Sequence, residues 1–231
     1  MFSPNLSNNQ SNILDTLIFK ESQIYLKYFH ALRTYETFQF LKVSLDFSEI
    51  QNIYDDIETT YKNRTPADEG LRLIFSRTLP LSYRVENYKI AKLNPIIQLQ
   101  IIKMPSANHT HFDSAYKWED RSYWNQLLNQ KKIEADDILV VNDHNHIIET
   151  SRFNIFLYDE KKDLVSTPTL DSGCLNGVYR RFVLDHGYLD LPGIGNKKIV
   201  EKKILQEELA INRIFVGNSV RGLLPACLIS T

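Results

Sequence analysis

Lys117 is the residue of this sequence best placed to act as a nucleophile. It lies in the stretch 114–121, Ser-Ala-Tyr-Lys-Trp-Glu-Asp-Arg, between the aromatic residues Tyr116 and Trp118. Aromatic bulk can exclude water from an amine, which lowers the pKa of the amine and makes it a usable nucleophile. Most lysines are solvated surface charges, so a chemical role for Lys117 depends on the other reactive groups that the chain supplies.

Glu149 is a second candidate because it interrupts an apolar segment. The segment 147–158 reads Ile-Ile-Glu-Thr-Ser-Arg-Phe-Asn-Ile-Phe-Leu-Tyr and is expected to form one long strand. A carboxylate buried in such a strand must be ion-paired or hydrogen-bonded, because an unpaired buried charge is strongly destabilising. Glu149 is therefore either a solvated strand-end residue or an anion held against a cationic partner.

Two glycine-containing turns offer backbone N–H groups to an anion. They have the sequences Leu-Asn-Gly-Val at 175–178 and Gly-Asn-Ser-Val at 217–220, and each is expected to lead into a helix. The first N–H groups of a helix are unpaired and lie at the positive end of its dipole, where they can bind phosphate. Arg33, within another expected helix, adds a guanidinium suited to the same group. Taken singly, glycine-containing turns of this kind are also typical of ordinary helix starts that bind no anion. Arg33 taken singly is also typical of an ordinary arginine on a helix surface.

An amine, a strand carboxylate, two turns rich in N–H groups and an arginine are the parts that pyridoxal 5′-phosphate (PLP) requires. The amine forms a Schiff base with the cofactor, and the carboxylate keeps the pyridine nitrogen protonated so that the ring can accept electrons. The turns and the arginine would bind the phosphate. The combination therefore indicates PLP chemistry more strongly than any of its members does.

The elements that must position these residues alternate between strands and helices, which favours an α/β fold. Apolar residues of 27–41 recur at three- and four-residue steps, a pattern typical of a helix with one buried face. The other elements expected in the first half are strands at 13–19, 22–25, 71–77, 81–89 and 95–104 and a helix at 48–61. In the second half we expect helices at 121–132, 176–186 and 201–209 and strands at 137–141, 147–158, 164–167 and 213–216.

The stretch 105–113, Pro-Ser-Ala-Asn-His-Thr-His-Phe-Asp, has no periodic apolar pattern and is expected to link two domains. We therefore expect a flexible tail at 1–12, a small N-terminal α/β domain at 13–104 and a larger cofactor-binding domain at 114–231. The two His-x-His sequences of the chain have no nearby cysteine or carboxylate cluster at ligand spacing, so no metal site is predicted.

The composition is that of an ordinary globular protein, with 231 residues, 43% hydrophobic and 24% charged. A net charge of −1 gives no reason to expect nucleic acid or an anionic membrane as a partner. No apolar run approaches the roughly 20 residues that span a bilayer, and the polar start of the chain lacks the features of an export signal. Two cysteines are more typical of a reduced protein than of a disulfide, so we expect a cytoplasmic location.

In order and local sequence, these motifs resemble those of the fold-type IV PLP enzymes, the group of class IV aminotransferases and aminodeoxychorismate lyases. The resemblance extends over about residues 13–226 of the chain. The motifs that carry it are His-x-x-Arg at 30–33, Lys117 with Arg121, Glu-Thr-Ser-Arg-Phe-Asn-Ile-Phe at 149–156, Leu-Asn-Gly-Val-Tyr-Arg at 175–180 and Asn-Ser at 218–219.

The resemblance implies a role for each matched residue. Lys117 would be the Schiff-base lysine, Glu149 the partner of the pyridine nitrogen, and Asn154 a support of the cofactor strand. Arg121 falls where lyase-like and short bacterial members carry an arginine and branched-chain aminotransferases carry a tyrosine. The remaining matched residues would bind the phosphate: Arg33, Gly177, Val178, Asn218 and Ser219.

The same resemblance implies a two-domain architecture like that of D-amino acid aminotransferase, with the cofactor between the domains, and a homodimer. Two reactions stay open. The first is transamination of an amino acid and keto acid pair, and the second is release of pyruvate and 4-aminobenzoate from aminodeoxychorismate for folate synthesis. A non-catalytic binding protein on the same fold is a third interpretation.

The sequence departs from the family pattern in its N-terminal part. The glycine-rich segment that precedes the first strand of longer members is missing, Asp15-Thr16 replaces the usual glutamate-threonine pair, and the chain is shorter than most members. These departures bear on the substrate side of the site. Three arginines are alternatives for binding the substrate carboxylate: Arg72, Arg77 and Arg84.

Overall fold

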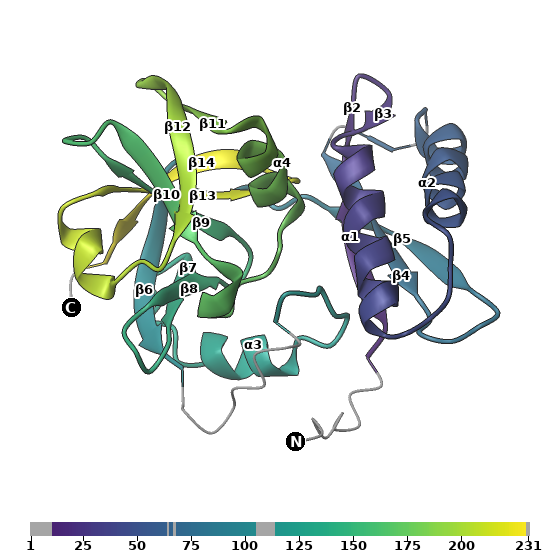
Figure 1. Ribbon diagram of the computed structural model, residues 1–231, viewed down its shortest axis with the longest axis horizontal. Coiled ribbons are helices and arrows are strands. Elements are labelled where there is room, and N and C mark those ends of the chain that lie inside the picture. Colours follow the sequence, from purple (N-terminus) through teal and green to yellow (C-terminus); the bar gives the residue numbers. More distant parts are fainter. Residues whose placement is uncertain (1–10, 64, 67, 105–113, 230–231) are drawn as a thin grey trace.

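The computed structural model describes residues 11–63, 65–66, 68–104 and 114–229 (Figure 1). Nearly all of the expected tail, and the whole of the expected linker, lie outside the described residues. The described part contains two main sheets and four α-helices, which confirms the mixed α/β fold class. None of its helices has the length and apolar character needed to cross a membrane.

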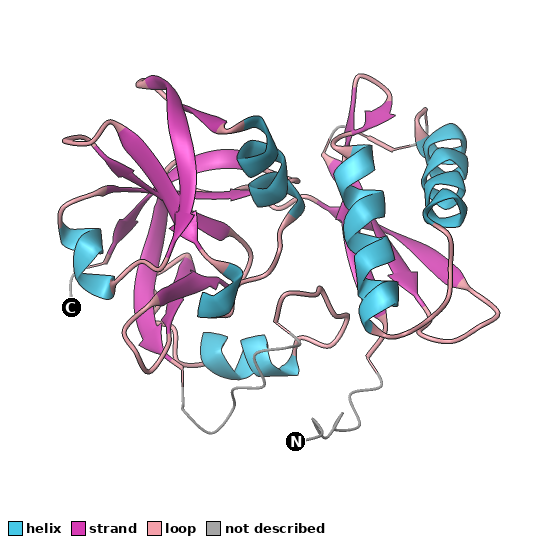
Figure 2. Cartoon of the chain, viewed as in Figure 1, coloured by secondary structure: helices cyan, strands magenta, loops and turns pink. Residues whose placement is uncertain are grey.

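The smaller sheet is antiparallel and packs against two helices that lie side by side (Figure 2). Its strands follow the order β1-β4-β5, and a short hairpin, β2-β3, precedes the first helix. Leu71 on the central strand, Phe38 on the first helix and Ile50 on the second are fully buried in one core. The bounds are β1 Ile13–Leu17, β2 Phe19–Lys20, β3 Gln23–Ile24, α1 Lys27–Phe40, α2 Phe47–Tyr61, β4 Glu69–Phe75 and β5 Tyr83–Lys89.

The larger sheet has nine strands in the order β11-β12-β10-β9-β13-β14-β6-β7-β8. Its pairs are antiparallel except β10 with β12, β14 with β6 and β6 with β7, which are parallel. The bounds are β6 Ile97–Lys103, β7 Asp137–Val141, β8 Ile147–Thr150, β9 Asn154–Asp159, β10 Leu164–Pro168, β11 Tyr188–Leu191, β12 Gly195–Lys202, β13 Arg213–Asn218 and β14 Gly222–Leu228. The helical segments of this half are α3 Ser122–Leu128, η2 Leu170–Ser172, α4 Val178–His186 and η3 Gln206–Ala210.

The strand expected at 95–104 belongs to the larger sheet and not to the N-terminal one. This strand, β6, pairs in parallel with β14 and with β7, and both Ile97 and Leu99 are buried in the core of the larger sheet. The expected division after residue 104 therefore does not coincide with the change of sheet, which falls between Lys89 and Ile97. Alternating apolar residues identify a strand, but they do not identify the sheet that the strand joins.

The long strand expected at 147–158 is interrupted. It forms β8 and β9, and the turn between them is closed by Thr150, whose amide donates to the Phe153 carbonyl at 2.9 Å. The Thr150 side chain also accepts a hydrogen bond from the Phe153 amide at 2.8 Å. This local competition for backbone groups ends the ladder, and it brings Glu149 and Asn154 together across the turn.

Three expected helices also differ from the structure. The helix expected at 121–132 is shorter, since α3 ends at Leu128. The helix expected at 201–209 is absent because β12 stays paired with β10 as far as Lys202, and only a 3-10 segment follows. The turn at 217–220 leads into strand β14 and not into a helix.

Helix α4 connects the two halves of the molecule. The rings of Phe182 on α4 and Phe29 on α1 meet edge to face, with their centroids 5.7 Å apart. Arg181 forms an ion pair with Glu36 of α1 at 2.7 Å. These contacts fix the start of α4, and therefore the turn at 175–178, relative to the helix that carries Arg33.

Candidate active site

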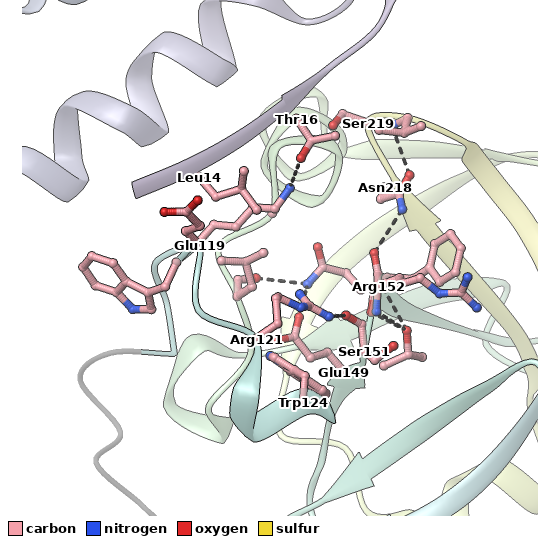
Figure 3. Close-up of a pocket in the computed structure, with 18 of the residues that line it drawn as sticks. Leu14, Thr16, Glu119, Arg121, Trp124, Glu149, Ser151, Arg152, Asn218 and Ser219 are labelled. Atoms are coloured by element: carbon pink, nitrogen blue, oxygen red, sulfur yellow. Dashed lines mark hydrogen bonds between the residues drawn. The ribbon is translucent and has the colours of Figure 1, made fainter. Parts of the chain in front are cut away.

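A cavity of about 880 Å³ lies between the smaller sheet and turns of the larger one. Figure 3 shows Thr16 on one side of it and Glu149 on the opposite side. All nine residues that the sequence suggested for a cofactor border this cavity: Arg33, Lys117, Arg121, Glu149, Asn154, Gly177, Val178, Asn218 and Ser219.

Lys117 is held at both ends by the first strand. Its Nζ donates to Thr16 Oγ1 at 2.8 Å, and its carbonyl accepts from the Leu14 amide at 2.9 Å. The residue is partly accessible from the cavity, but the surrounding protein removes bulk water from the amine. Burial, and then Arg33, lower the pKa of Lys117 to about 7 against the opposing effect of Asp15. A large share of the amine is therefore neutral and nucleophilic near neutral pH.

A buried cluster centred on Asp15 lies behind this lysine. The carboxylate accepts hydrogen bonds from the Tyr54 hydroxyl at 2.5 Å, from His30 Nδ1 at 2.9 Å and from the Thr16 amide at 2.8 Å, and it forms an ion pair with Arg33. Burial opposes the charge, but His30 and Arg33 outweigh it and keep the pKa of Asp15 well below its ordinary value. Asp15 therefore fixes both the arginine and the strand that holds the lysine.

Glu149 lies on the other side of the cavity and is only 6% exposed. Asn154 Nδ2 donates to its Oε2 at 3.2 Å. Burial raises the pKa of Glu149 to about 8, against the opposing effects of the Leu175 amide and of Arg121. Among the described residues no basic side chain forms an ion pair with Glu149. Near neutral pH the acid is therefore mostly protonated, and an approaching cation would favour its ionised form.

Arg121 is fixed next to the turn that follows Glu149. Its Nη2 donates to the Ser151 carbonyl at 2.5 Å, and its Cζ lies 5.5 Å from the centre of the Trp124 ring. The Ser151 hydroxyl in turn donates to the buried Asp137 at 2.5 Å. Burial lowers the pKa of Arg121, and Glu149 opposes this. Arg121 thus supplies a fixed positive charge at the side of the cavity where Glu149 lies.

The turn at 175–178 requires glycine. A Cβ atom added to Gly177 would lie 2.0 Å from Asn154 Oδ1. Asn154 Nδ2 also donates to the Leu175 carbonyl at 3.0 Å, so one side chain joins Glu149 to this turn. Gly177 is the N-cap of α4, and the amide of Val178 follows at the first position of the helix. The Gly177 amide donates to the Leu175 carbonyl at 2.8 Å, so the amides at the start of the helix begin with that of Val178, and both residues border the cavity.

The turn after β13 is shaped by its own asparagine. Asn218 Oδ1 accepts from the Val220 amide at 3.0 Å and from the Arg221 amide at 2.8 Å, and its Nδ2 donates to the Arg152 carbonyl at 3.0 Å. The side chain of Asn218 is therefore engaged with the turn, and Ser219 is left at the cavity (Figure 3).

Of the three arginines considered for a substrate carboxylate, Arg72 alone borders the cavity in the described residues. The guanidinium of Arg77 lies 5.4 Å from the centre of the Trp118 ring, and Arg84 is ion-paired with two glutamates. A further arginine at the cavity, Arg221, was not predicted from the sequence as a site residue. No pattern in the sequence distinguished it from an ordinary turn residue.

Asp15 and Tyr54 were also missed as supports of the site. Asp15 interrupts the apolar segment at 13–19 just as Glu149 interrupts its own strand, so the same signal was present. Tyr54 lies on the buried side of α2 and is fully buried. An aromatic residue at helical spacing is usually core packing, and only the structure reveals its hydroxyl on a carboxylate.

A model of the family of class IV amino-transferases matches residues 12–229. The chain belongs to this family. Members of this family are PLP-dependent aminotransferases and lyases, so the resemblance drawn from the motifs is confirmed, and the protein is a PLP-dependent enzyme. A comparison with curated proteins gave no match.

Solved structures of the same fold include members with different reactions. A fold IV transaminase from Curtobacterium pusillum is 16% identical, with a TM-score of 0.76 over 96% of this chain and 81% of its own. A 4-amino-4-deoxychorismate lyase from Pseudomonas aeruginosa is 17% identical, with a TM-score of 0.72 over 95% and 84%. A hypothetical aminotransferase from Mycobacterium tuberculosis in its PLP-bound form is 14% identical, with a TM-score of 0.77 over 95% and 82%. At these identities the likeness establishes the fold.

The residues of the cavity fit the family's cofactor. A neutral amine on one side can bond to an aldehyde, and a buried acid without an ion pair on the other side can neutralise a protonated ring nitrogen. Arg33 and the amides at the start of α4 are suited to a phosphate. The described residues thus contain a complementary group for the aldehyde, the ring nitrogen and the phosphate of PLP.

Proposed function

We propose that the protein is a class IV aminotransferase that acts on an amino acid and keto acid pair, with Lys117 as the amine that bonds to PLP. The observation that carries this proposal is that Lys117 and Glu149 border one cavity with pKa values shifted in opposite directions. Titratable groups perturbed by burial in a shared cavity are typical of catalytic sites.

Bound PLP supplies an electron-accepting ring that stabilises negative charge at the α-carbon of the substrate. The role of Lys117 is to bond to the cofactor and, once released, to carry a proton at its Nζ. A pKa of about 7 suits Lys117 to both tasks. Near neutral pH part of the amine is neutral and can form a bond, and the same amine can readily take up and release a proton. Thr16 Oγ1, at 2.8 Å from Nζ, keeps the amine in place between these tasks.

Glu149, once ionised, holds the proton on the ring nitrogen, and Asn154 orients the carboxylate. Arg33, the turn of Gly177 and Val178, and Ser219 bind the phosphate in this proposal. Arg33 is suited to this role because Asp15 fixes its position while the guanidinium still borders the cavity. Asn218 acts indirectly by shaping the turn that carries Ser219.

The second candidate function is aminodeoxychorismate lyase. It is favoured by Arg121, since lyase-like members resemble this chain at that position and the arginine borders the cavity. We also propose that the chain divides into two domains between Lys89 and Ile97, that it works as a homodimer, and that it is cytoplasmic. The change of sheet between these residues supports the division.

The test is a product assay on protein saturated with PLP. The aminotransferase proposal predicts keto acid from a common amino acid donor and no 4-aminobenzoate from aminodeoxychorismate. Pyruvate together with 4-aminobenzoate would support the lyase instead. Lys117→Ala should abolish either reaction, whereas the matched variant of an exposed lysine, Lys161→Ala, should retain it. Wild-type protein that takes up no PLP under saturating cofactor would refute both reactions.

A further inference from the structure

Asp137 is a fully buried carboxylate that has no role in the proposed function. It is the first residue of β7 and is 0% exposed. A buried carboxylate is strongly destabilising unless hydrogen bonds or cations compensate for it. Its Oδ1 accepts from the Ser151 hydroxyl at 2.5 Å and from the Ile138 amide at 2.8 Å. Its Oδ2 accepts from Arg152 Nε at 3.3 Å. Apart from the adjacent amide, the partners of Asp137 therefore belong to the turn between β8 and β9.

This turn, residues 150–153, separates Asp137 from the cavity. Ser151 and Arg152 border the cavity, whereas Asp137 is not among the described residues that do. Arg152 Nη2 also donates to the Asp136 carbonyl at 2.9 Å, so a second bond joins the turn to the start of β7. Asp137 therefore acts on the cavity only through the residues of the turn.

The turn in turn connects three residues of the candidate site. Glu149 lies directly before it, near the end of β8. The Ser151 carbonyl accepts from Arg121 Nη2 at 2.5 Å, and the Arg152 carbonyl accepts from Asn218 Nδ2 at 3.0 Å. A displacement of the turn would therefore displace the acid, and it would disturb the contacts of the other two residues as well.

The charge of Asp137 and its position have opposite consequences for Glu149. Asp137 contributes to raising the pKa of Glu149, an effect that opposes ionisation of this acid. The charge of Asp137 thus does not favour a Glu149 anion. The hydrogen bonds of Thr150 close the turn locally, whereas those of Asp137 attach it to the neighbouring strand β7. The contribution of Asp137 to the site is therefore positional.

We propose that Asp137 is a positioning residue that holds Glu149 against the ring nitrogen of PLP through Ser151 and Arg152. This inference rests on the proposed function, in which Glu149 pairs with the ring nitrogen, and it adds the residue that keeps that acid in place. A group that contacts a ligand loses much of its effect when it is displaced by about 0.5 Å or more. The contact with the ring nitrogen therefore depends on an anchor behind the turn.

The test compares PLP with 1-deazapyridoxal 5′-phosphate, which has a C–H group in place of the ring nitrogen and keeps the aldehyde and the phosphate. Both dissociation constants are measured on cofactor-free protein by quenching of tryptophan fluorescence. Both tryptophans of the chain, Trp118 and Trp124, border the cavity. The wild type should bind PLP roughly 10- to 100-fold more tightly than the analogue, as expected for one charge-assisted hydrogen bond. This ratio isolates the contact with the ring nitrogen, because the other contacts are common to both compounds.

Two variants test the anchor. Ser151→Ala keeps the charge of Asp137 but removes its hydrogen bond to the turn, and Asp137→Asn removes its ion pair with Arg152. Each should lower the ratio by roughly tenfold, as found for residues that orient metal ligands, and should leave the affinity for the analogue nearly unchanged. Because both variants act through one turn, the double variant should lower the ratio no further.

The neighbouring Asp136 provides the matched control. Its carboxylate accepts from Asn94 Nδ2 at 2.7 Å and from the Gln98 amide at 2.9 Å, away from the turn. Asp136→Asn should therefore keep the ratio of the wild type.

Three results would contradict the inference. If Ser151→Ala and Asp137→Asn weakened both compounds by the same factor, the role of Asp137 would be structural only, and the inference alone would be overturned. A ratio that rises in Asp137→Asn would also overturn it, because Asp137 would then act on Glu149 through its charge. Equal affinities in a wild type that binds both compounds would refute the pairing of Glu149 with the ring nitrogen, and the inference with it. A wild type that binds neither compound would refute the proposed function itself.

Discussion

Replacing Glu149 by glutamine should change the stability of the cofactor-free protein in a pH-dependent way. The pKa of Glu149 is about 8 in the folded protein, against an ordinary value of 4.5. Because the folded pKa is the higher one, Glu149 contributes stability that is fully present below about pH 4.5 and is lost as the pH rises through 8. At about 1.4 kcal/mol per pKa unit, the free energy of unfolding of the wild type should fall, relative to Glu149→Gln, by about 4 kcal/mol between about pH 5 and pH 9.

The measurement is urea unfolding of the two cofactor-free proteins at several pH values in this range. Lys117 titrates in both proteins, so its contribution cancels in the difference. Glu207→Gln, at an exposed position, is the control and should follow the wild type at every pH. Glu149→Gln should also weaken PLP binding, since glutamine cannot neutralise the charge of the protonated ring nitrogen. A stability difference that does not vary with pH would refute the conclusion that Glu149 is a buried acid without a cationic partner.

Three further predictions concern the groups around this acid. In cofactor-free protein, Lys117 should react with an amine-acylating reagent at half its maximal rate near pH 7, where the pKa of its amine lies. Solvated lysines should reach half their maximal rate only at a pH of about 10. If the pH profile of Lys117 matched that of the solvated lysines, burial would not lower its pKa. Gly177→Ala should lower stability by about 1–3 kcal/mol, because its Cβ would displace Asn154, and adding Asn154→Ala should restore part of the loss in urea unfolding. Asp15→Asn should destabilise the protein by about 3–5 kcal/mol, since it leaves the charge of Arg33 buried without its partner; a change below about 1 kcal/mol would contradict that ion pair.

The sequence identified the chemistry of the site because the decisive residues are exceptions within regular patterns. Glu149 stands out as an acid in an apolar segment, and Lys117 stands out by its aromatic neighbours. Such exceptions are destabilising unless the fold compensates for them, so their residue types carry functional information. The order of the motifs along the chain then allowed the family to be recognised.

Long-range pairing was not predictable in the same way. The apolar residues of 95–104 indicated a strand but could not indicate that its partners would be β14 and β7, one of which lies more than a hundred residues later. The turn between β8 and β9 could not be predicted, because Thr150 is a residue typical of strands. The hydrogen bonds of its side chain that form the turn are known only from the structure.

The central claim is that one amine and one acid of this cavity hold PLP between them. Its most direct test is borohydride reduction of PLP-saturated protein followed by peptide mapping. We expect a single reduced adduct on the peptide that contains Lys117, and we expect that adduct to be absent from Lys117→Ala. An adduct on another lysine, or none on saturated wild-type protein, would contradict the claim.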